Sequence, residues 1–139
     1  GAKLKEICRI ALRKKSKAHC ELEKIIYDRL EFLEDGKIAF AYLNLEDYEN
    51  THAEMGDDEG LVEMLRDIED VEVAVLLKEK EGANGYKASL RSHETVNVSD
   101  ICMLLGGGGH RGAAGCFING TLDQAKTKII NAVKQGLKK

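Results

Sequence analysis

The amino-acid sequence predicts an α/β (α+β) fold, in which a mixed β-sheet of about four to five strands packs with helices and follows N-terminal connector helices. Strand-like alternation at 37–43, 71–77, 86–91 and 114–118 is separated by segments with helical spacing. The glycine-rich turn at 82–85 joins two of these strands as a hairpin. A chain of 139 residues with 43% apolar and 32% charged residues is typical of one globular domain.

The first 34 residues predict two amphipathic helices or one bent helix. Apolar residues recur at helical spacing from Leu4 to Leu12 and from Leu22 to Leu33, with the basic run 13–17 between them. A solvated helix face explains this run better than a contact with a phosphate backbone. We therefore expect an N-terminal helical connector over 1–34 and the main domain over 35–139.

The predicted central strands differ in their side-chain pattern. Segment 37–43 is apolar on both faces, which is typical of a strand covered on each side, and 71–77 is the clearest strand of the chain. Segment 86–91 is apolar on one face only, and its other face carries Lys87, Ser89 and Arg91. That polar face is either a phosphate-binding surface or the solvated side of an antiparallel strand.

A glycine run is the most unusual stretch of the chain. Four glycines at 106–109 precede His110, and small residues follow at 113–115. Glycine lets an anion approach backbone N–H groups closely, and a histidine adds a donor that titrates near physiological pH. A flexible linker is the alternative, but an apolar pattern resumes directly at 113–118. We therefore predict an anion-binding loop.

The same run matches G-x-G-x-x-G, but a dinucleotide-binding fold needs a strand before it and a helix after it. Here the predicted order is the reverse, and no P-loop motif occurs in the chain. Both of these nucleotide-binding folds are excluded on that ground.

Composition excludes several other classes of protein. A net charge of −3 argues against a dedicated duplex-DNA binder. No apolar run reaches membrane-spanning length, so no membrane partner is expected. The four cysteines lack zinc-finger spacing and predict reduced thiols in a cytoplasmic protein, with Cys102 and Cys116 in the core. The acidic segment 51–59 with His52 favours helix capping over a metal site.

Two motifs together resemble a known family. They are 87–92 (Lys-Ala-Ser-Leu-Arg-Ser) and 106–115, where Gly-Gly-Gly-Gly-His is followed after two residues by Ala-Ala-Gly, with Val-Ser-Asp-Ile at 98–101 between them. Residues 35–139 are similar to the C-terminal DHH-associated domain of DHH superfamily phosphoesterases. They most resemble the subfamily of oligoribonucleases that also remove a phosphate from 3′-phosphoadenosine 5′-phosphate.

The resemblance implies a substrate-binding domain and not a complete enzyme. In the family an upstream domain holds two divalent metals, expected to be manganese, through Asp and His residues that include an Asp-His-His motif. This chain has no Asp-His-His, so no catalytic residue, metal ligand or cofactor is expected in it, and the chain alone is expected to be inactive. The implied partners are that upstream catalytic domain of the same polypeptide and a short oligonucleotide or phosphorylated nucleotide.

The resemblance also implies site residues. Arg91 and His110 would hold the substrate phosphate, and the glycine loop would offer backbone N–H groups. The full set of predicted substrate-binding residues is Arg91, His110, Gly107, Gly108, Gly109, Ser89, Ser92 and Lys87. The serines and Lys87 have a simpler alternative, because such side chains often bond neighbouring backbone or remain solvated.

Two other functions stay open from the sequence. One is a nucleic-acid-binding appendage for tRNA or single strands without a hydrolytic role, since a similar domain ends alanyl-tRNA synthetases. The acidic net charge and the 5% aromatic content count against it. The other is an interaction module in which the N-terminal helices form a homodimer seam.

Overall fold

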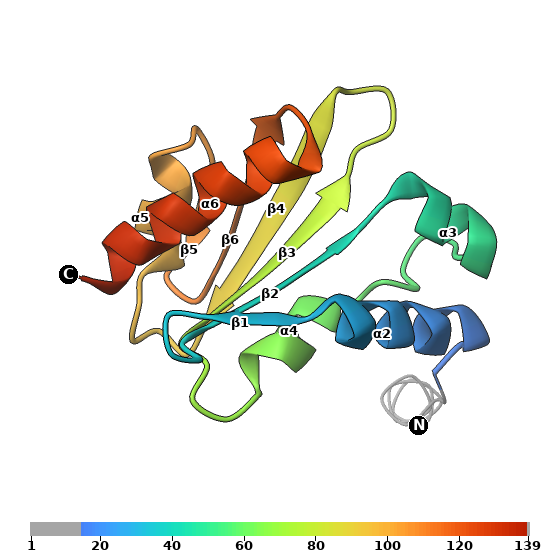
Figure 1. Ribbon diagram of the computed structural model, residues 1–139, viewed down its shortest axis with the longest axis horizontal. Helices are drawn as coiled ribbons and strands as arrows, with labels where there is room; N and C mark the ends of the chain where they lie inside the picture. The colour runs from blue at the N-terminus through green and yellow to red at the C-terminus, as the bar shows by residue number, and fades with distance from the viewer. Residues whose placement is uncertain (1–14, 139) are drawn as a thin grey trace, which may run out of the picture.

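The computed structural model describes residues 15–138, which form a six-stranded mixed sheet with helices on both faces (Figure 1). The elements in chain order are α2 (Lys17–Arg29), β1 (Glu31–Leu33), β2 (Ile38–Leu43), α3 (Leu45–Thr51), α4 (Leu61–Arg66), β3 (Val73–Glu79), β4 (Gly85–Ser92), α5 (Val98–Met103), β5 (Gly108–His110), β6 (Ala113–Asn119) and α6 (Leu122–Leu137). The strand order is β1-β2-β3-β4-β6-β5. Only β2 and β3 run parallel among the neighbouring strands of this sheet. The predicted α/β class with a mixed sheet is confirmed.

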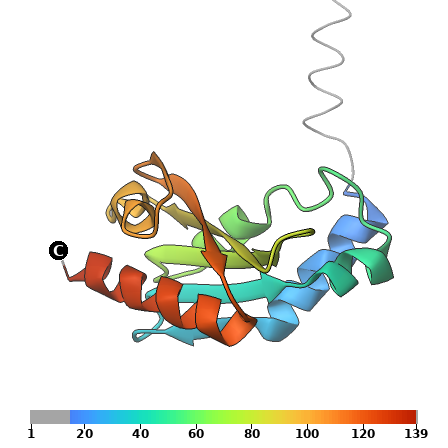
Figure 2. The same cartoon turned by 90° about the horizontal axis from the view of Figure 1, so that it is seen from above.

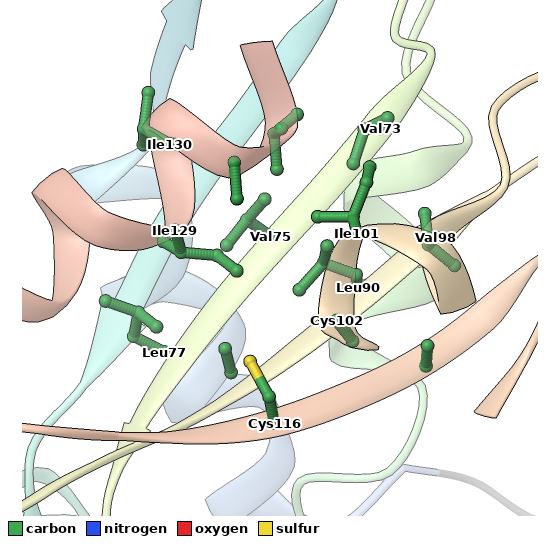
Figure 3. Close-up of a cluster of buried hydrophobic side chains, with 14 of the residues drawn as sticks. Val73, Val75, Leu77, Leu90, Val98, Ile101, Cys102, Cys116, Ile129 and Ile130 are labelled. Carbon is green, nitrogen blue, oxygen red and sulfur yellow. The ribbon is translucent and has the colours of Figure 1, made fainter. Parts of the chain in front are cut away.

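One face of the sheet packs against α5 and α6. Val75 and Leu77 of β3 meet Ile129 of α6 and Ile101 of α5 in the larger apolar core (Figure 3). Side-chain caps start both helices: Asn97 caps α5, and a capping box at 121–124 starts α6. Cys102 and Cys116 are buried in this core, as predicted.

The opposite face of β2 and β3 packs against α2 and α4 (Figure 1, Figure 2). The strands present mostly small side chains there, such as Ala39, Ala41 and Ala74, and these allow the helices to approach closely. Leu22 of α2 and Leu65 of α4 fill the space above them. The predicted two-sided burial of segment 37–43 is confirmed.

Three details differ from the sequence expectations. The helical spacing that extends to Leu33 ends at Arg29, and 31–33 form β1, which pairs with β2 through a tight turn. Glu34 and Asp35 have positive φ in that turn, and Gly36 follows with φ 84°. Pairing with the sheet therefore outweighs the helical spacing. The third strand begins at Val73, while Val71 packs under α2 and α4.

β5 is a strand that the sequence analysis does not predict separately. The predicted helix from Leu4 to Leu12 lies outside the described residues.

A partly buried ion pair ties α2 to α3. Both guanidinium amino groups of Arg29 donate to the carboxylate of Asp47, at 2.6 and 3.0 Å. Asp47 is 7% exposed and also accepts a hydrogen bond from the Asn44 backbone N–H at 2.6 Å, which closes the capping box of α3. The hydrogen-bonded carboxylate raises the pKa of Arg29. Without Asp47, the Arg29 guanidinium and the N-terminus of α3 would both lose the carboxylate that accepts their hydrogen bonds.

We expect Asp47→Ala to lower the free energy of unfolding by about 3 kcal/mol, because a partly buried guanidinium loses its counter-charge. Urea denaturation followed by circular dichroism measures the change. The matched control is Glu21→Ala in the exposed pair with Lys24, which should change stability by less than about 0.5 kcal/mol. Equal effects of the two substitutions would contradict the role given to Asp47.

A second polar cluster joins α3, β3 and the loop between α3 and α4. Burial opposes ionisation of Asp58, but the hydroxyl of Tyr48, which donates to it at 2.8 Å, and Lys78, at 3.3 Å, outweigh burial and lower its pKa. Burial of Tyr48 and the adjacent carboxylate of Asp58 raise the pKa of the Tyr48 hydroxyl. The ionised form of Asp58 therefore stabilises the folded state.

This cluster predicts a specific acid sensitivity. Because the folded pKa of Asp58 lies below its ordinary value of 3.8, its contribution is complete above that value and is lost as pH falls through the folded pKa. Urea denaturation between pH 7 and pH 3 should show a flatter acid limb in Asp58→Asn, with Tyr48→Phe intermediate. Three superimposable pH profiles would refute this assignment.

Candidate functional site: the open face of the sheet

Helices cover only part of the sheet on the α2 side. On this side α2 contacts β2, and α4 contacts β3 and β4. Further along the sheet, Lys87, His110 and Phe117 are exposed, and Arg91 and Gly115 are half-buried. The sheet therefore has an accessible surface on β4, β6 and β5.

Strand register places five of the predicted site residues on this surface in rows, and Gly109, opposite Ala114, lies on the other face. Residues directly opposite each other in an antiparallel pair share a face. Arg91 lies opposite Ala113, and Ala113 lies opposite His110. In the next row Ser89 lies opposite Gly115, which lies opposite Gly108. We call this surface the open face; its residues are Lys87, Ser89, Arg91, Gly108, His110, Ala113, Gly115 and Phe117.

The middle of the open face has very little side chain. Ala113, Gly115 and Gly108 separate Arg91 and Lys87 on one strand from His110 on the edge strand. A bulky ligand can therefore approach the backbone of β6 between basic residues.

The glycines of the loop have different structural roles. Gly106 has φ 86° in the turn that follows α5, where a left-handed residue ends a helix. A Cβ on Gly107 would overlap the Gly115 carbonyl oxygen, and a Cβ on Gly109 would lie 2.6 Å from the Ala113 oxygen. Gly108 is different: the nearest atom to its Cβ position is Cγ of Met103, at 3.9 Å. Packing therefore requires glycine at 107 and 109 but leaves room for a side chain at 108.

The backbone of the glycine run does not have the compact shape of an anion-binding loop. Residues 108–110 form an extended edge strand paired with β6. Successive N–H groups of an extended strand point in opposite directions, so those of Gly108 and Gly109 do not converge on one atom.

Arg91 is held in position by α4. Its Nε donates to Oε1 of Glu63 at 3.0 Å, and its Nη1 donates to the carbonyl oxygen of Leu90 at 2.9 Å. The two side chains of the ion pair are 26% and 34% exposed. Within residues 15–138 no hydrogen bond engages Nη2. The guanidinium is therefore oriented and still has an amino group for a ligand.

The two predicted serines lie on different faces. Ser89 is 9% exposed and lies between Lys87 and Arg91 on the open face. Ser92 is 3% exposed, and its hydroxyl donates to the carbonyl oxygen of Val96 at 2.6 Å. The structure therefore brings Ser89 to the row of site residues and places Ser92 in the segment behind it.

The structure adds two basic residues that the sequence analysis does not single out. His110 and Ala113 line a hollow of about 450 Å³ together with Arg66, Ser92, His93, Glu94 and Gly112. His93 Nε2 lies 3.2 Å from the Arg66 carbonyl oxygen, and the hydrogen bond from Arg66 lowers the pKa of Asp67. Basic residues are common in the last turn of a helix, so the sequence does not distinguish Arg66. The fold brings Arg66 next to β5 and β6.

Between residues 15 and 138, no group of three or more His, Cys, Asp or Glu side chains is placed to hold a metal ion. Across the same residues, no helix has both the length and the apolar character needed to cross a membrane.

Comparison with known proteins identifies the family. Residues 35–139 match the family model of the DHHA1 domain. The chain is 39% identical over 82 residues to the bifunctional oligoribonuclease and PAP phosphatase NrnA of Thermus thermophilus, a match that covers 58% of this chain and 25% of that protein.

Two solved structures share the fold. An exopolyphosphatase-related protein from Bacteroides fragilis matches with a TM-score of 0.84 and 24% identity, over 94% of this chain and 38% of its own. The pGpG-specific phosphodiesterase PggH from Vibrio cholerae matches with a TM-score of 0.59 and 16% identity, over 85% of this chain and 40% of its own. The chain thus spans well under half of each of these three proteins. Because the family match covers most of the chain, the protein belongs to the DHHA1 domain family.

Proposed function

We propose that this chain is the substrate-recognition domain of a metal-dependent phosphoesterase that acts on short oligonucleotides or phosphorylated nucleotides. The observation that carries the proposal is the row formed by Arg91, Ala113 and His110 across three strands of the open face. The relative NrnA, named an oligoribonuclease and PAP phosphatase, supports a nucleotide as the ligand.

In this proposal Arg91 and His110 bind one phosphate from two sides. A guanidinium donates N–H groups in a planar fork that matches phosphate oxygens, and hydrogen bonds between charged groups are stronger than neutral ones. Ala113 between them has no polar side chain, so the phosphate can rest close to the strand. Ser89 would add a hydroxyl in the adjacent row.

The hydrolytic step belongs to a DHH catalytic domain outside this chain. Two divalent metals in that domain, expected to be manganese, would activate water and stabilise charge on the phosphoryl group. This chain would bind and orient the nucleotide, which lowers the entropic part of the barrier. Residues 35–139 would form the recognition unit, and α2 and β1, which pack on it, would lie between this unit and that domain.

Gly108 gives independent support for a ligand on the open face. Neither its φ nor its packing requires a glycine, yet it lies in the same row as Gly115 and Ser89. Close approach of a ligand to the backbone explains the missing side chain. His110, two residues later on β5, borders the same approach.

Substitutions at the phosphate row test the proposal. We expect Arg91→Ala to weaken binding of adenosine 5′-monophosphate (AMP) to the 139-residue chain by about tenfold or more, and His110→Ala by about fivefold, because each removes a donor to the phosphate. Glu63→Gln keeps an acceptor for Arg91 but removes a competing negative charge, so AMP should bind more tightly. Isothermal titration calorimetry measures all three.

Arg111→Ala is the matched control, since Arg111 donates to the Glu94 carbonyl oxygen and lines a separate hollow. It should leave AMP affinity within about twofold of wild type, a small change on the free-energy scale. Wild-type affinity in both the Arg91 and the His110 variants would refute the proposed phosphate site.

Two glycine substitutions separate binding from folding. Gly108→Ala should change stability by less than about 0.5 kcal/mol, because its methyl group has room, and should weaken AMP binding because the methyl group enters the ligand space. Gly107→Ala should cost more than about 2 kcal/mol, since its methyl group overlaps β6. Thermal unfolding and calorimetry measure both effects. A Gly108→Ala protein that binds AMP normally would show that the row with Gly108 does not contact ligand.

A further inference from the structure

We infer that Ser99, at the start of α5, is a positioning residue that fixes the β5 backbone next to His110. The inference rests on the proposed function, in which the His110 ring binds the phosphate. It also gives a role to the Val-Ser-Asp-Ile segment at 98–101, which the proposed phosphate site does not use.

His110 needs support from outside its own strand. β5 has three residues, two of which are glycines, and it is the last strand at its edge of the sheet. Glycine has more backbone freedom to lose than any other residue, so a strand of this composition holds its own conformation weakly. Among residues 15–138, no hydrogen bond or ion pair engages the His110 ring, and the side chain is exposed. The position of the ring therefore depends on the backbone that carries it.

α5 supplies hydrogen bonds to the backbone on either side of His110. The Ser99 hydroxyl donates to the Gly109 carbonyl oxygen at 3.2 Å, in the peptide group that joins Gly109 to His110. The Val98 backbone N–H donates to the carbonyl oxygen of Arg111, the next residue along the chain, at 2.9 Å. α5 lies beside β5 in the fold (Figure 1). Two consecutive residues of one helix therefore hold the chain before and after the histidine.

Ser99 is itself held in place. Its backbone N–H donates to Oδ1 of Asn97, the residue that caps α5, at 3.0 Å. On either side of it, Val98 and Ile101 are buried in the larger apolar core. A hydroxyl group carried by a capped and packed helix start is already oriented before it meets its acceptor. The bond between Ser99 and Gly109 therefore restrains the strand and not the helix.

A simpler explanation of this hydrogen bond is that it only satisfies a carbonyl group at the edge of the sheet. Such a bond would contribute to stability but would not orient His110. The two explanations differ in how substitutions at Ser99 and His110 combine. If Ser99 acts through the His110 ring, its substitution has no effect on ligand binding once that ring is absent.

The experiment is a double-mutant cycle on the 139-residue chain, with AMP as the ligand and isothermal titration calorimetry as the measurement. Ser99→Ala should weaken AMP binding by about threefold in the wild-type background and by less than about 1.5-fold in the His110→Ala background. Ser99→Thr keeps the hydroxyl and should bind AMP within about 1.5-fold of wild type. In a proton–carbon NMR spectrum of the free protein, Ser99→Ala should shift the His110 ring signals and leave those of His52 in place.

Thr51→Val is the matched control, because the Thr51 hydroxyl also donates to a backbone carbonyl oxygen, that of Asp47 in α3, at 2.8 Å. It should leave both AMP affinity and the His110 ring signals unchanged. Circular dichroism melting curves show whether each variant is folded at the temperature of the titration.

The possible results separate the two proposals. Equal weakening by Ser99→Ala in both backgrounds, or no weakening in either, would overturn the positioning role. In both cases a loss of AMP affinity in the single variant His110→Ala would leave the phosphate site intact. AMP affinity that does not depend on His110 would overturn the phosphate role of His110 and the positioning role of Ser99 with it.

Discussion

Incomplete helical cover of one sheet face is the constraint on which the rest of this structure depends. Strands β2 and β3 are covered on both sides and contribute buried apolar residues to both cores. On the α2 side, β6 and β5 extend past the helices, so their other face alone must hold them in the core through Ala114, Cys116 and Ile118. Because side chains alternate, one half of the residues in these strands packs in the core and the other half stays accessible. A residue of these strands that packs in the core therefore cannot also belong to the accessible surface.

Hydrogen bonds orient the Arg91 guanidinium, and a partly exposed ion pair with Glu63 balances its charge. Its ion pair with Glu63 is about one-third exposed, and pairs of this kind contribute only about 0.2–1 kcal/mol in water. In the proposed phosphate site, a phosphate, which carries more charge and more acceptor oxygens than one carboxylate, would replace Glu63 at small cost. The hydrogen bond to the Leu90 carbonyl oxygen does not depend on that exchange and keeps the guanidinium at the sheet. Glu63 of α4 thus balances the charge of Arg91, and the Leu90 carbonyl group of β4 orients its guanidinium.

Sequence periodicity predicted well which residues share a face of a strand. It could not predict contacts between segments that are far apart in the chain. A period of two assigned Lys87, Ser89 and Arg91 to one face, and the structure confirms this. The same period places Ser92 with Leu90, behind the open face. Periodicity carries no information on strand order, so it could not show that His110 lies two strands from Arg91 or that Glu63 contacts it. At 31–33 pairing with β2 overrode helical spacing, because a short apolar run fits both periods.

The two-residue connection between β5 and β6 has a consequence for how this family can tolerate insertions and deletions. Only Arg111 and Gly112 join the edge strand to β6, and Ser92 donates its backbone N–H to the Gly112 carbonyl oxygen at 3.0 Å. One added or lost residue within β6 would shift its pairing with β4 by a single position. Phe117 would then face α6, and Cys116 and Ile118 would face the opposite side, so one change would disrupt both the core and the open face. Length changes in this part of the chain are therefore expected beyond Asn119, where the strand ends, and not within it.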